Sequence, residues 1–90
     1  MAVFMVVPTS EVEKVKATVG RHFADQSLEL PRGEHLVRFN GTSRQLSDQL
    51  GISDGSMGGA VVVSLGGYFG YAPNEIWEWF KQNWGGAPNG

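Results

Sequence analysis

Two segments of this 90-residue chain are apolar at almost every position. They are Ala2–Val7 and Ala60–Leu65, both of strand length and both rich in β-branched residues. In an antiparallel sheet with one face in water, apolar and polar residues alternate along each strand. A strand that is apolar throughout is buried on both faces. The chain is therefore expected to cover both faces of its sheet at these two strands.

Two capping boxes predict where helices begin, because each pairs a hydroxyl residue with Glu or Gln three positions later. The first is Ser10–Glu13 and the second is Thr42–Gln45. Apolar residues that share one face of the first helix are Val12, Val15, Val19 and Phe23. Gly51 is placed to end the second helix in the left-handed conformation, so that helix has about two turns.

Two alternating segments, Ser27–Leu30 and His35–Asn40, surround the turn sequence Pro31–Gly33 and predict a β-hairpin. The resulting order of elements is β-α-β-β-α-β with one helix appended. This order predicts an α+β fold of the ferredoxin-like (split βαβ) type, with four antiparallel strands in the order 4-1-3-2 and both crossover helices on one face. We expect one compact domain over residues 1–84 and a flexible Gly-rich tail over residues 85–90.

The appended helix follows Pro73 and contains all three tryptophans. Its wide aromatic arc predicts that it packs across the first and fourth strands, on the face away from the other helices. Tyrosine and tryptophan are common in binding hot spots, which makes this region a candidate partner-binding surface. Its candidate residues are Tyr68, Tyr71, Trp77, Trp79 and Trp84. The alternative interpretation is that these rings complete the core of a small domain.

A second candidate site surrounds the start of the second helix, where backbone N–H groups converge and hydroxyl and guanidinium groups are close in sequence. Its residues are Arg38, Thr42, Ser43 and Arg44, which together could hold an anion. The alternative is a capped helix with a solvated arginine and a cross-strand pair between Arg38 and Glu29, since every capped helix offers the same donors.

The remaining motifs do not predict catalysis, a metal or a cofactor. The chain has no cysteine and only two histidines, without a clustered acid pair. His22, Asp25, Ser27 and His35 are residue types found in hydrolases, but their spacing does not place a base beside a nucleophile. Gly55–Gly59 precedes a strand, whereas a phosphate-binding loop follows a strand and opens a helix. The sequence thus identifies no catalytic residue and does not favour an enzyme.

Nucleic acid and membrane are not expected partners. The net charge is −2, and Gly67–Tyr71, although similar to the aromatic motif of RNA-binding ferredoxin-like domains, follows the fourth strand without basic neighbours. No apolar segment approaches the ~20 residues of a membrane span, and the apolar N-terminal run is too short for a signal peptide. We expect a cytoplasmic, non-catalytic protein-interaction or regulatory module that binds another protein or a second copy of itself. The alternative is a small-ligand (anion) binding domain or a minor enzyme.

Overall fold

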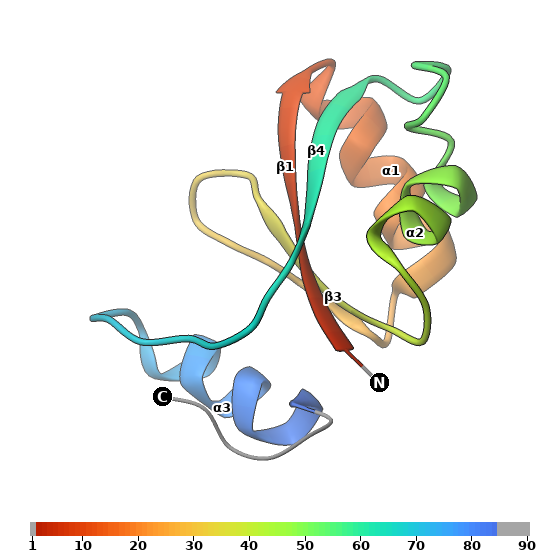
Figure 1. Ribbon diagram of the computed structural model, residues 1–90. Helices are drawn as coiled ribbons and strands as arrows, with labels where there is room; N and C mark the ends of the chain where they lie inside the picture. Colours follow the sequence, from red (N-terminus) through yellow and green to blue (C-terminus); the bar gives the residue numbers. More distant parts are fainter. Residues whose placement is uncertain (1, 85–90) are drawn as a thin grey trace.

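The computed structural model describes residues 2–84. Its elements are β1 (Ala2–Ser10), α1 (Val12–Phe23), β2 (Ser27–Glu29), β3 (His35–Phe39), α2 (Ser43–Leu50), β4 (Gly59–Ser64) and α3 (Asn74–Asn83). The strands form one antiparallel sheet in the order β2-β3-β1-β4, which confirms the predicted strand order. Figure 1 shows α1 and α2 together beside the sheet and α3 well away from them. The predicted tail at 85–90 lies outside the described residues.

Strand β1 continues past Pro8 to Ser10, although the sequence predicts a strand that stops at Val7. The Leu65 N–H donates to the Val3 carbonyl at 3.0 Å, so the odd-numbered residues of β1 bond to β4 and the even-numbered ones face β3. Pro8 is even-numbered and lies beyond the end of β3. Its missing N–H therefore removes no ladder hydrogen bond, which is the condition for proline in a strand.

The predicted capping box at the start of α1 is wrong. Ser10 belongs to β1, and its Oγ accepts a hydrogen bond from the Gly59 N–H at 3.1 Å, across to β4. Glu11 has a left-handed backbone (φ 48°), and α1 begins after it at Val12 without a side-chain cap. The serine thus joins two strands at a bulge, and Glu13 lies in the first helical turn without a capping role.

Both predicted signals for α2 are confirmed. The Gln45 N–H donates to Thr42 Oγ at 3.1 Å, and the Thr42 N–H donates to Gln45 Oε1 at 2.9 Å. Gly51 ends the helix with φ 78°, and the Ile52 N–H donates back to the Ser47 carbonyl at 3.0 Å. This terminator brings Ile52 into the core.

Helices α1 and α2 cover one face of the sheet and enclose a first core. Its buried members are Phe4, Val6, Val15, Val19, Phe23, Val37, Leu46, Leu50 and Ile52. The two helices are also joined by a buried hydrogen bond, in which the Thr18 hydroxyl donates to the Leu50 carbonyl at 2.7 Å. The predicted apolar face of α1 is confirmed except at its first turn, where Val12 is exposed.

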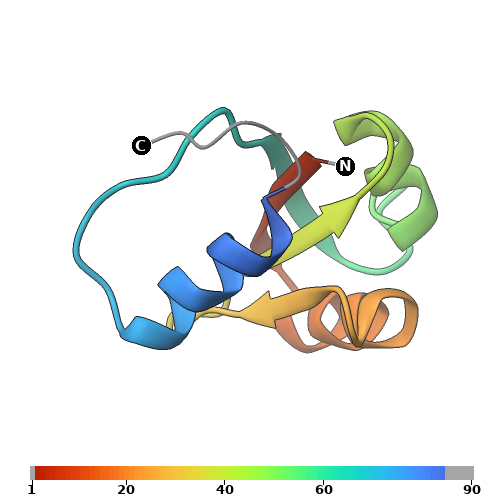
Figure 2. The ribbon, with the colours of Figure 1, turned by 90° about the horizontal axis from the view of Figure 1, so that it is seen from below.

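A second core lies on the opposite face of the sheet, under α3. Its buried members are Val3, Leu36, Ile76 and Phe80, and half-buried aromatic and aliphatic side chains surround them. Figure 2 shows α3 joined to β4 by a long connection that arcs away from the sheet and returns to it. Over residues 2–84, the structure has no helix long and apolar enough to cross a membrane.

The predicted packing of α3 over β1 and β4 is wrong for β4. The register pairs Leu28 with Leu36, Leu36 with Met5 and Met5 with Val63, so one apolar row crosses all four strands on the α3 face. Helix α3 covers the part of this row on β2, β3 and β1, whereas Val61 and Val63 of β4 stay 52% and 37% exposed. The leucines of the hairpin, rather than the valines of β4, supply the apolar surface that α3 buries.

Candidate functional site

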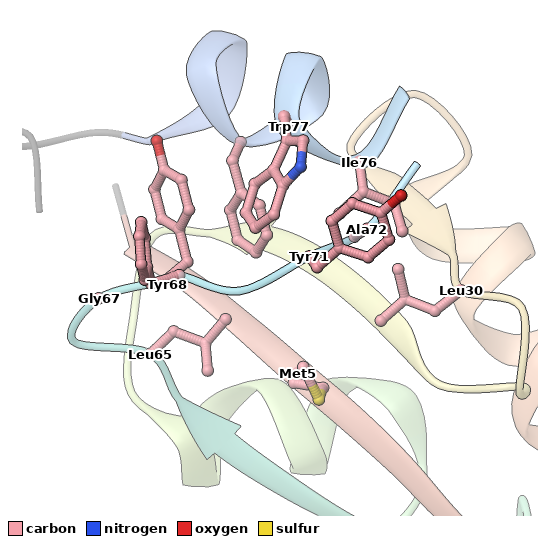
Figure 3. Close-up of a pocket in the computed structure, with 11 residues that line it drawn as sticks. Met5, Leu30, Leu65, Gly67, Tyr68, Tyr71, Ala72, Ile76 and Trp77 are labelled. Carbon is pink, nitrogen blue, oxygen red and sulfur yellow. The ribbon is translucent and has the colours of Figure 1, made fainter. Parts of the chain in front are cut away.

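The connection between β4 and α3, residues 65–73, forms one wall of an apolar cleft of about 350 Å³. Figure 3 shows the side chains of this connection and of α3 facing one another above Met5 of β1 and Leu65. The lining residues are Met5, Leu30, Leu65, Gly67, Tyr68, Phe69, Tyr71, Ala72, Ile76, Trp77 and Phe80. None of these side chains is charged, so the cleft suits an apolar group.

Tyr68 is the residue that fixes the connection to α3. Its ring stacks on Phe80 with the centroids 4.2 Å apart and the planes 3° from parallel. Trp84 meets Tyr68 edge-on at 4.9 Å, and Trp77 lies 5.9 Å from it. Offset and edge-on ring pairs add roughly 0.5–1.5 kcal/mol each to the area that they bury. This cluster therefore holds the inner wall of the cleft in place.

Four of the five aromatic residues predicted to bind a partner are half-buried parts of the second core. These four are Tyr68, Trp77, Trp79 and Trp84. The fifth, Tyr71, is fully exposed at the rim of the cleft. The interpretation of the rings as core thus describes most of the cluster, and Tyr71 alone has the exposure of a free binding residue.

Phe69 is a second exposed rim residue, and it is not among the residues predicted to bind a partner. It is 90% exposed, and with Tyr71 it brackets Gly70, whose φ of 141° is open to glycine and strained for other residues. The signal was present in the sequence: Gly66 and Gly67 precede the aromatic run and Gly70 interrupts it, so its rings belong to no helix or strand that could bury them in a regular pattern.

Arg38 is separated from the other three residues of the predicted anion site. Arg38 lies two residues after Leu36 in β3, so both side chains are on the face of the sheet that α3 covers. Helix α2 packs on the other face. Thr42 and Gln45 bond to each other's backbone N–H groups, which occupies two of the donors at the start of α2. Ser43 and Arg44 follow in its first turn, with Arg44 exposed. The arrangement is that of a capped helix. The expected pair between Arg38 and Glu29 is wrong, because Glu29 shares a sheet face with His35 and forms its ion pair with Lys16.

The two histidines lie in separate places. The His22 ring is near the Thr18 carbonyl, 3.0 Å from Nδ1 to the oxygen, on the surface of α1. His35 is only 3% exposed, and burial lowers its pKa below the ordinary value of 6.5, with Glu29 acting in the opposite direction. Across residues 2–84, no three His, Asp or Glu side chains are grouped so that they could hold a metal ion.

Comparison of the chain with protein-family models, with curated proteins and with solved structures gives no significant match. The cleft and the exposed side chains around it are therefore the features from which a function can be inferred.

Proposed function

We propose that this chain is a ferredoxin-like domain with an appended helix that acts as a non-catalytic protein-interaction module. The order β2-β3-β1-β4, with α1 and α2 on one face, supports the fold assignment. That fold hosts many unrelated functions, so the functional proposal depends on the cleft alone.

The single observation that carries the proposal is the apolar cleft with Phe69 and Tyr71 exposed at its rim. Large aromatic side chains are costly to leave in water, roughly 25 cal/mol for each Å² of apolar surface. The same residue types, when they become buried against a partner, supply much of the binding energy of protein interfaces. The proposed partner inserts an apolar side chain into the cleft and buries both rim rings.

A protein partner fits this cleft better than a small polar metabolite. Small-molecule sites combine apolar walls with a few placed polar or charged groups that fix the orientation of the ligand. Here the polar side-chain groups of the lining are limited to the hydroxyls of Tyr68 and Tyr71 and the indole N–H of Trp77. An aliphatic or aromatic side chain of another protein could bind in this cleft without further polar groups to orient it.

A photo-crosslinking amino acid placed at position 71 in cells of the native host tests the proposal. We expect a specific crosslinked protein from position 71 and none from position 12, since Val12 is an exposed apolar residue on α1, on the other side of the sheet. Absence of a product from position 71, or equal products from both positions, would contradict the proposal.

The affinity of the purified partner then identifies the residues involved. We expect Phe69→Ser with Tyr71→Ser to weaken binding about 10- to 100-fold, because the two rim rings together should contribute about 1.4–2.8 kcal/mol of binding free energy. The matched control, Val12→Ser, should leave the affinity within about twofold, since it removes exposed apolar surface outside the cleft. Unchanged binding by the double variant would assign the partner to another surface. A small molecule that co-purifies with the wild type in native mass spectrometry and is lost from the double variant, while the partner still binds that variant, would instead assign the cleft to a ligand.

A further inference from the structure

Strand β4 has one edge that pairs with no strand in the described part of the chain. It is the last strand in the order β2-β3-β1-β4. The bond from the Leu65 N–H to the Val3 carbonyl fixes the phase of the ladder, so Val61 and Val63 direct their backbone groups toward β1. The backbone N–H and C=O groups of the alternate residues, Ala60, Val62 and Ser64, consequently point outward from the open edge.

The two edges of the sheet differ in how they are protected. Edge strands are commonly kept from pairing by short length and by charged residues or proline. Strand β2 has three residues, and its Glu29 forms an ion pair with Lys16 at 3.5 Å. Strand β4 has six residues, and the sequence has no charged residue anywhere from Gly55 to Asn74. Of the two edges, that of β4 lacks both kinds of protection.

The exposed apolar surface of β4 lies beside this edge. Val61 and Val63 are on the α3 face, at the end of the apolar row that α3 leaves uncovered. A strand that paired with the edge would extend that row and bring its own side chains against these valines. Backbone hydrogen bonding and the burial of apolar surface therefore both favour the pairing of another strand with the open edge of β4.

We propose that β4 pairs antiparallel with β4 of a second copy of this chain, about a two-fold axis at Val62. In this register Val62 meets Val62 of the second copy, and Ala60 meets Ser64. These are the residues whose backbone groups point outward, so each pair exchanges both N–H···O bonds. The strand is complementary to itself, which is the requirement of an isologous interface.

The same register places Val61 opposite Val63 of the second copy on the exposed face. These residues form non-hydrogen-bonded pairs, in which the Cβ atoms are closest, roughly 4.5–5.5 Å. The exposed valines thus cover one another, and no charge opposes the contact. The two-fold axis is perpendicular to the sheet, so the dimer has one continuous eight-stranded sheet with both α3 helices on the same face. This interface uses the edge of β4 and does not depend on the function proposed for the cleft.

Two variants with substitutions at the same exposed positions test both the dimer and its register. Val61→Lys with Val63→Lys puts lysine side chains opposite each other in both cross-strand pairs. Val61→Lys with Val63→Glu puts a lysine opposite a glutamate in both pairs and changes the same two residues. Opposite charges directly across two strands are favourable and like charges are unfavourable.

Sedimentation equilibrium of the full chain, from micromolar to millimolar concentration, measures the molecular mass and hence the oligomeric state of each protein. We expect a mass of twice 9.8 kDa for the wild type and for the Lys/Glu variant, and a monomer for the Lys/Lys variant. Thermal unfolding of all three proteins checks that each is folded. A wild type that remains monomeric, or a dimer that the Lys/Lys variant leaves intact, would overturn the proposal. A dimer broken equally by both variants would overturn the register and the proposal with it.

Discussion

Replacing Phe80 with alanine tests whether α3 is an integral part of the fold. Phe80 is 6% exposed, stacks on Tyr68 at 4.2 Å, and meets Trp79 and Trp84 edge-on at 6.0 and 5.9 Å. Phenylalanine-to-alanine changes in cores cost about 3–5 kcal/mol. Because Phe80 also borders the cleft, its surroundings can relax, and we expect a loss near the lower end, about 3 kcal/mol.

For a domain of this size, each kcal/mol lowers Tm by about 4–8 °C, so the loss corresponds to roughly 12–24 °C. Urea and thermal unfolding, followed by tryptophan fluorescence and far-UV circular dichroism, measure both quantities. The control is Tyr71→Ala, which removes a fully exposed ring and should change stability by no more than about 0.5 kcal/mol. A loss below about 1 kcal/mol for Phe80→Ala would show that α3 does not pack on the sheet as described. An equally large loss for Tyr71→Ala would place the rim of the cleft in the core.

Three further changes probe the first core and its helix ends. Thr18→Val should lower the unfolding free energy by about 1–3 kcal/mol in urea titrations, because the Leu50 carbonyl loses its buried donor; a neutral effect would argue against that bond. Gly51→Ala should cost about 1–2 kcal/mol, since φ is 78° and the added Cβ would lie 2.8 Å from Met57 Cγ; unchanged stability would contradict this helix terminator. The buried His35 remains neutral in the fold while the unfolded chain takes up a proton below about pH 6.5, so stability falls as the pH drops through that value toward the lower folded pKa. His35→Gln should flatten that part of a stability-against-pH curve, and an unaltered slope would assign it to other groups.

Local sequence signals predicted the elements that depend on neighbouring residues. The start and end of α2 are encoded within the ten residues Thr42–Gly51, and both are formed as expected. The start of α1 was predicted wrongly because Ser10 bonds to Gly59, 49 positions later in the chain. A capping box and a strand-joining serine look alike in sequence, and only the pairing of β1 with β4 distinguishes them.

The assignment of side chains to the two faces of the sheet also depends on contacts between residues far apart in the sequence. Alternation in the hairpin indicates which residues share a face, but it does not say which face of the sheet that is. The pairing of Leu28 with Leu36 puts the hairpin leucines under α3, and this decides where α3 packs and which valines of β4 remain uncovered. Likewise, the separation of Arg38 from α2 follows from strand phase, which the spacing in sequence does not reveal.

The two cores lie on opposite faces of one sheet, and we expect them to differ in stability. Residues 2–64 contain the whole β-α-β-β-α-β arrangement and the first core, whereas α3 is attached through residues 65–73 and its aromatic contacts. Such an arrangement allows sub-global opening, in which α3 detaches while the sheet and the other two helices remain folded. The amides of α3 would then exchange with solvent at a lower free energy than those of β1 and β3. The opened form would expose Val3 and Leu36, so we expect proteases and chaperones to act on this form before the chain unfolds globally.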